Sequence, residues 1–95
     1  MSDVEARMAA LCRRFAASAG QQAVALRNAL QANDQDRAVE VAHHLAGAAG
    51  IFGQPMLGEQ ALILEEAIDA NADEAVVNSL AQELLAALDR LAQSR

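Results

Sequence analysis

Residues 42–53 read AHHLAGAAGIFG, and they combine the apolar spacing of a helix with two histidines and three glycines. Apolar residues recur around this stretch at steps of three and four, which is the spacing of one helix face: Ala38, Val41, Leu45, Ala48 and Phe52. Gly47 and Gly50 would lie inside such a helix, and each costs roughly 1 kcal/mol relative to alanine. A cost of this size indicates either close packing at the glycines or a surface left open for a partner.

The same helical spacing runs along the whole chain, and alternation at period two is almost absent. The first predicted helix begins with Ser2 as N-cap and Glu5 three residues later, and it fades near residues 18–20. Polar or glycine-containing breaks at residues 33–36, 53–54 and 69–73 separate the later segments, and Pro55 suits a first helical turn. The later apolar stripes lie within residues 23–30, 38–52, 57–68 and 77–91.

These segments predict an all-α fold. Loops of about 2 to 6 residues between helices favour antiparallel neighbours. We therefore expect an antiparallel up-down four-helix bundle with an additional N-terminal helix packed on it, all in a single domain of residues 1–95. All the apolar stripes can be used inside such a bundle, which favours a monomer.

Composition and charge argue against several classes of function. Seven basic and thirteen acidic residues give a net charge of −6, and Arg13-Arg14 is the only adjacent basic pair, so nucleic-acid binding is not expected. No apolar run approaches the 18 residues of a membrane span, and the first residues are acidic, which predicts a cytoplasmic protein with no membrane contact. Cys12 is the only cysteine, which excludes an intramolecular disulfide and a tetrahedral thiolate metal site.

The two histidines point in different directions on the predicted helix. At about 100° per residue, with Leu45 at the centre of the buried stripe, His43 lies about 160° away and His44 about 100° away. Gly47 and Gly50 share the outer face with His43. Core packing does not easily explain glycines that face away from the core, so this geometry favours an open patch for a partner around His43.

A metal site is not expected at the histidine pair. Adjacent residues on a helix do not share a face, so His43 and His44 cannot chelate one ion together. Gly47 occupies the position four residues after His43 where a second ligand would be needed, and Glu40, three residues before it, is a single weak candidate. For His44, a solvated position on the helix flank is the favoured interpretation.

An exposed neutral imidazole is a competent nucleophile when a hydrogen bond fixes its tautomer. The helix after Pro55 offers Glu59, Glu65 and Glu66 for that bond, and Glu65 lies at the border of the buried stripe beside Leu64. From the residues alone, an ordinary exposed histidine and a carboxylate solvated at its tip remain open alternatives.

Residues 38–66 resemble the histidine-containing phosphotransfer (HPt) family. The family pattern runs Ala-His-x-Leu-Lys-Gly, then a glycine ten residues after the histidine, then a Leu-Glu or Leu-Gln pair on the next helix. The matching positions are Ala42, His43, Leu45, Gly47, Gly53, Leu64 and Glu65.

The resemblance implies a phosphorelay intermediate of bacterial two-component signalling. His43 Nε2 would accept a phosphoryl group from an aspartate of a response-regulator receiver domain, or donate one to it, and Glu65 would hold the Nδ1–H tautomer. The partners would be such a receiver and/or a hybrid histidine kinase. Mg²⁺ is expected only in the receiver, so no cofactor is expected here. The docking surface would comprise Glu40, His44, Ala46, Gly47 and Gly50.

One position departs from the family pattern. The lysine expected three residues after the histidine, which helps to balance phosphoryl charge, is Ala46 here. Arg37, on the opposite flank of the helix, is a candidate to compensate for it. The alternatives are a phosphorylation-impaired adaptor that docks a receiver through the same face, or a bundle with an unrelated interaction role.

Overall fold

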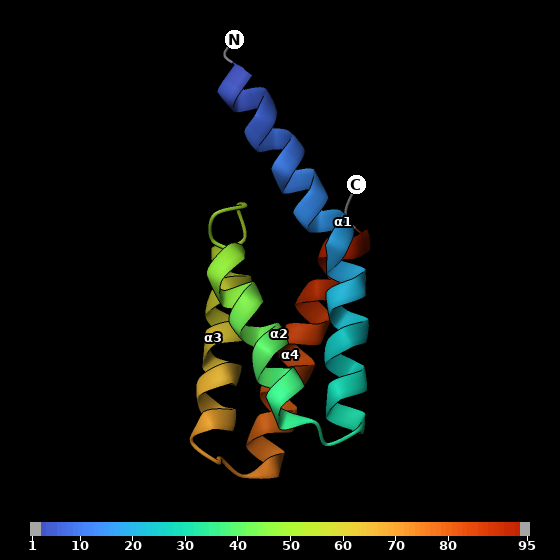
Figure 1. Cartoon of the computed structure of the whole chain (residues 1–95), viewed down its shortest axis with the longest axis vertical. Helices are drawn as coiled ribbons and strands as arrows, with labels where there is room; N and C mark the ends of the chain where they lie inside the picture. Colours follow the sequence, from blue (N-terminus) through green and yellow to red (C-terminus); the bar gives the residue numbers. More distant parts are fainter. Residues whose placement is uncertain (1–2, 94–95) are drawn as a thin grey trace.

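The computed structural model describes residues 3–93 and contains only α-helices within that range. The helices are α1 (Asp3–Gln31), α2 (Gln35–Ala48), α3 (Pro55–Asp69) and α4 (Glu74–Gln93). Short connections return the chain, so that successive helices run in opposite directions (Figure 1). Packed pairs form a closed ring of α1 with α2, α2 with α3, α3 with α4, and α4 with α1. The prediction of an all-α fold is confirmed.

The helix ends have local causes in the sequence. The Asp34 carboxylate caps α2 by accepting a hydrogen bond from the Arg37 backbone N–H at 3.0 Å. Asn33, just before the cap, has a φ of 55°, a left-handed conformation that asparagine tolerates better than most residues. Pro55 occupies the first turn of α3, where its missing N–H would have no partner in the helix.

The predicted separate N-terminal helix is wrong, because α1 is continuous through residues 18–20. The buried face continues across them at helical spacing through Phe15, Ala19 and Ala23. A Cβ on Gly20 would lie 3.8 Å from the Ala92 Cβ, so this glycine lies close to α4. Figure 1 shows the N-terminal half of α1 leaning away from the axis of the other half. The Ser18 hydroxyl, which donates to the Phe15 carbonyl at 2.8 Å, is a typical cause of such a bend.

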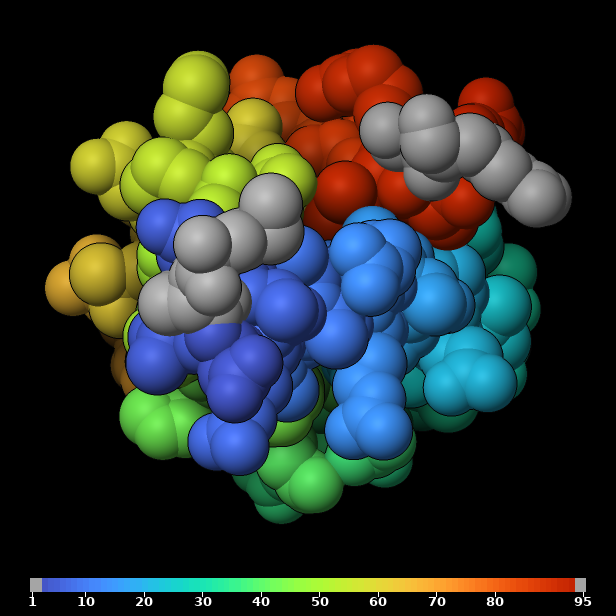
Figure 2. All heavy atoms as spheres, turned by 90° about the horizontal axis from the view of Figure 1, so that it is seen from above, coloured from blue at the N-terminus to red at the C-terminus, as the bar shows by residue number. Residues whose placement is uncertain are grey.

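The N-terminal half of α1 projects beyond the bundle. In Figure 2 it is the foremost segment, seen against the α2–α3 connection and the C-terminal end of α4. Val4, Met8 and Leu11 are exposed, so this part of the helix does not pack on the bundle as predicted. Burial starts at Phe15, whose ring lies 5.6 Å from that of Phe52. The predicted N-cap, Ser2, lies outside the described residues.

The core is a stack of leucines from every helix. The largest fully buried side chains are Leu26, Leu45, Leu64, Leu84 and Leu88. Each contributes about 1.5–3 kcal/mol through removal from water, and alanines fill the remaining space between the helices. On the surface, Arg27 on α1 pairs with Asp89 on α4 at 2.6 Å. Because Leu45 faces the core, the opposite side of α2 faces solvent.

The helix around residues 42–53 ends earlier than predicted. α2 stops at Ala48, and residues 49–53 form a turn. The Gln54 N–H closes this turn on the Ala49 carbonyl at 2.8 Å, and Gly53 has a φ of +84°, which favours glycine. Gly50 therefore lies in the turn and not inside the helix, so its predicted helix cost does not apply.

Candidate functional site

The structure brings His43 and Glu65 together across the α2–α3 seam. His43 Nδ1 lies 2.8 Å from Glu65 Oε2, which is hydrogen-bonding distance. The His43 side chain is 77% exposed, whereas that of Glu65 is 15% exposed. The carboxylate is therefore held at the edge of the core while the imidazole extends into solvent. His43 Nε2 makes no hydrogen bond within the described residues.

This contact decides which nitrogen of His43 can react. An ionised carboxylate can only accept hydrogen bonds, so Glu65 favours the tautomer in which Nδ1 carries the proton. The lone pair of the neutral ring then lies on Nε2, at the exposed side. A half-buried carboxylate that orients an exposed imidazole is an arrangement suited to nucleophilic chemistry.

α2 packs closely on α3 beside this contact, and the packing leaves room only for a small residue at Gly58, a position not singled out in the sequence. Gly58 is buried, and a Cβ there would lie 3.5 Å from the Ala49 Cβ and 3.6 Å from the Gly50 nitrogen. Glu65 lies seven residues after Gly58 on α3, and His43 lies seven residues before Gly50 on the antiparallel α2. The signal was available, since Gly58 is a glycine inside a predicted helix.

The predicted docking residues differ in exposure and in the element on which they lie. Gly47 is exposed within α2, and a Cβ there would meet nothing within 4 Å, so the surface beside His43 is open. His44 is exposed and makes no hydrogen bond within residues 3–93. Ala46 is half-buried and packs against the core. Gly50 is exposed in the turn beyond α2, with open space around it.

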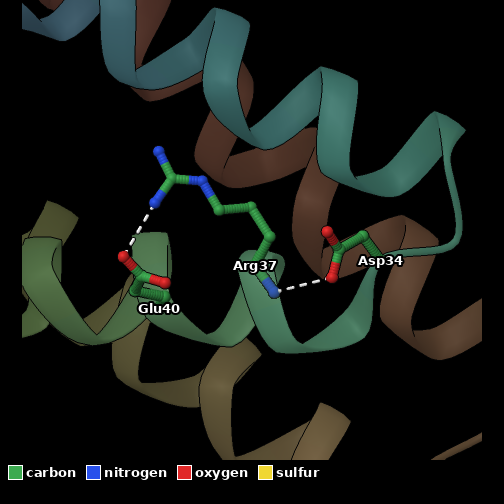
Figure 3. A network of polar contacts seen from close by, with 3 residues as sticks. All are labelled: Asp34, Arg37 and Glu40. Carbon is green, nitrogen blue, oxygen red and sulfur yellow. Dashed lines mark hydrogen bonds and ion pairs between the residues drawn. The ribbon is translucent and has the colours of Figure 1, made fainter.

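Glu40 lies on the other side of His43 from α3 and is engaged by an arginine. Arg37 Nη1 donates to Glu40 Oε1 at 2.8 Å, as Figure 3 shows. A shallow hollow beside α1 is lined by this ion pair and by both histidines; its lining residues are Gln22, Arg37, Glu40, Val41, His43 and His44. His43 thus lies between a carboxylate on α3 and an ion pair on its own helix.

The described range, residues 3–93, lacks both a cluster of metal ligands and a membrane-spanning helix. No group of three or more His, Cys, Asp or Glu side chains in this range is placed to hold a metal ion. No helix within it combines the length and apolar character that a membrane span needs.

Comparison with known protein families gives a match to the Hpt domain over residues 10–94. Neither the curated proteins nor the solved structures yield a match. The matched range contains His43, Glu65, Gly58 and the Arg37–Glu40 pair. It also contains the part of α1 that packs in the core, and it begins within the projecting part.

Proposed function

Because the chain belongs to the Hpt domain family, we propose that His43 is the residue that carries its phosphoryl group. Hpt domains perform histidine phosphotransfer in two-component signalling and interact with response-regulator receiver domains and kinases. The observation that carries the proposal is the 2.8 Å contact between His43 Nδ1 and Glu65 Oε2, on a histidine whose side chain is 77% exposed.

The transfer step uses the free nitrogen of His43. The Nε2 lone pair attacks the phosphorus of an aspartyl phosphate on the receiver. The new N–P bond forms as the P–O bond to the aspartate breaks, and the electron pair of that bond leaves with the aspartate carboxylate. The proton on Nδ1 stays in place, and Glu65 balances the positive charge that the ring acquires. Donation to a receiver is the reverse of this step.

The protein supplies the nucleophile and a docking surface, and the receiver supplies the metal ion. Both carboxylates that flank His43 are already engaged, Glu65 by His43 itself and Glu40 by Arg37. We therefore place the Mg²⁺ that balances the transferring phosphoryl group in the acidic pocket of the receiver. Gly47, one helical turn after His43, leaves room for the receiver backbone to approach.

The test is phosphotransfer from a phosphorylated receiver domain. The wild-type protein should acquire a base-stable, acid-labile phosphate, and His43→Gln should acquire none. His44→Gln is the matched control for the site of labelling, because it removes the adjacent exposed imidazole but keeps His43, and it should still acquire the phosphate. An unlabelled wild-type protein, or label retained by His43→Gln, would contradict the proposal.

Ala46 favours one alternative, a docking module that is poorly phosphorylated. It is half-buried and aliphatic at the position where the family pattern has a lysine. This alternative predicts that His43→Gln leaves receiver binding and signalling unchanged. A binding measurement on the same variant separates the two functions, because the relay requires that signalling be lost even when binding persists.

A further inference from the structure

We propose that Arg37 supplies the positive charge that stabilises a phosphoryl group on His43, and that Glu40 holds this arginine in place until the group arrives. The inference rests on the proposed phosphorylation of His43. It assigns a role to an ion pair on the flank of α2 that lies away from Ala46.

The charges around His43 create the need for such a residue. Within residues 35–69, which span α2 and α3, Arg37 is the only arginine or lysine. The same range contains six carboxylates: Asp36, Glu40, Glu59, Glu65, Glu66 and Asp69. A phosphoryl group brings a charge of about −1.5 to −2 near pH 7. Ala46 cannot offset this charge, so Arg37 is the only cationic residue of α2 and α3 that could do so.

The position of Arg37 lets its side chain serve His43. Its backbone N–H is held by the Asp34 cap, and its side chain extends along α2 toward Glu40, as Figure 3 shows. Glu40 is three residues before His43, so the two are neighbours on the helix surface. Arg37, Glu40 and His43 all line the same shallow hollow. The guanidinium is therefore held on the side of His43 that faces away from Glu65.

The ion pair is exposed enough to rearrange. The side chains of Arg37 and Glu40 are 49% and 71% exposed, and an ion pair in such a setting is weak. A guanidinium has five N–H donors in a planar fork and binds phosphoryl oxygens well. Arg37 can thus turn toward a phosphoryl group on Nε2 while it continues to neutralise Glu40, the carboxylate that would otherwise repel that group.

The first measurement needs no partner protein. In a His44→Gln background, phosphoramidate phosphorylates His43: Nε2 attacks phosphorus, the N–P bond of the reagent breaks, and ammonia leaves. The ³¹P chemical shift is then followed against pH. Arg37→Ala should raise the titration midpoint of the phosphoryl group by about 0.3 to 0.7 pH unit, because the dianion loses its cation. Arg37→Lys should restore most of the shift, and Glu40→Gln should lower the midpoint.

The second measurement is the equilibrium partition of phosphate between this protein and a receiver. Arg37→Ala should shift it about two- to fivefold toward the receiver. The matched control is Arg27→Ala, which makes the same change in net charge at an exposed ion pair joining α1 to α4. It should change neither readout, and circular dichroism should show all variants folded.

The outcomes separate this inference from the proposed function. If Arg37→Ala behaves as Arg27→Ala does in the ³¹P titration, the role of Arg37 is wrong even when His43 is phosphorylated. If the receiver fails to label the wild-type protein, the proposed relay is wrong, and the ³¹P titration of chemically phosphorylated protein still decides the role of Arg37. If neither the receiver nor phosphoramidate labels His43, both are overturned.

Discussion

His43 and His44 are adjacent on α2 and both are exposed, yet the structure gives them different surroundings. Nδ1 of His43 lies 2.8 Å from Glu65 on the neighbouring helix. His44 has no hydrogen-bond partner within the described residues. Because both histidines are exposed, exposure alone does not mark a candidate nucleophile. The distinguishing feature of His43 is the carboxylate on a second helix that orients its ring.

The helical repeat explains why only one histidine is oriented. Consecutive residues differ by about 100° around the helix axis. Ala46, on one flank of α2, has its carbonyl 3.6 Å from the position of a Gly58 Cβ, so that flank faces α3. The opposite flank borders the hollow beside α1, where His44 lies with Gln22. His43 lies far enough toward α3 to reach Glu65, whereas its neighbour does not.

The largest expected effect, on the rate of phosphotransfer, comes from removing the hydrogen-bond partner of His43, so that both histidines lack one. Glu65→Ala removes the acceptor on Nδ1, so the Nδ1–H tautomer is no longer favoured and Nε2 is less often the free nitrogen. Phosphotransfer should slow by about 10- to 100-fold, as when other groups that orient a functional imidazole are removed. Stopped-flow or quench kinetics with a phosphorylated receiver measure this rate.

Two further variants test that explanation for Glu65. Glu65→Gln should be slower than wild type but faster than Glu65→Ala, because the amide oxygen can still accept from Nδ1–H while the charge that balances the ring is lost. Glu66→Ala removes the exposed adjacent carboxylate and should have little effect. Transfer kinetics that are unchanged in Glu65→Ala would remove Glu65 from the mechanism.

The next largest effect is expected from the packing of α2 on α3 at Gly58, which brings Glu65 within reach of His43 but not of His44. Gly58→Leu would push α2 away from α3, since even a Cβ would lie 3.5 Å from Ala49. We expect a loss of about 1–3 kcal/mol in unfolding free energy, measured by urea denaturation, together with slower phosphotransfer. Gly58→Ala fits at ordinary contact distance and should retain both stability and transfer. Equal stability of the two variants would show that the seam is not tightly packed.

Much of this arrangement could be predicted from the sequence, because periodicity directly reports which face of a helix is buried. The spacing around Leu45 predicts an exposed His43, and the border position beside Leu64 makes Glu65 the candidate acceptor for its Nδ1 proton. The all-α fold follows from the same signal, since apolar stripes at steps of three and four run along the chain.

The rest depended on competition between local signals and on distances between helices. At residues 18–20, Gly20 indicated a break, but the apolar stripe continues past it and the helix continues with it. Near Gly50 the opposite occurred, because a turn in which Gly53 has a positive φ prevailed over apolar spacing. The role of Gly58 depends on the distance between α2 and α3, and the apolar spacing within one helix does not report that distance.

A smaller effect is expected at Gly47, the open position beside His43. Gly47→Ala adds a methyl group to open space within α2 and should stabilise the fold by about 0.5–1 kcal/mol in urea denaturation. Gly47→Leu should also leave the fold stable, but its side chain would cover the approach to His43 and slow phosphotransfer. Improvement of both stability and transfer in Gly47→Leu would contradict the open-patch interpretation.

The smallest expected effect is spectroscopic and tests the comparison without changing the protein. Two-dimensional ¹⁵N–¹H correlation of the imidazole rings, at a pH where both are neutral, distinguishes the two tautomers of each histidine. His43 should be held as Nδ1–H by its bond to Glu65, while His44 should exchange between both forms, since the structure shows no hydrogen bond to its ring. In Glu65→Ala the two rings should give similar spectra. A wild-type His43 found mainly as Nε2–H would mean that its reactive nitrogen is blocked, and the different surroundings of the two histidines would then have no chemical consequence.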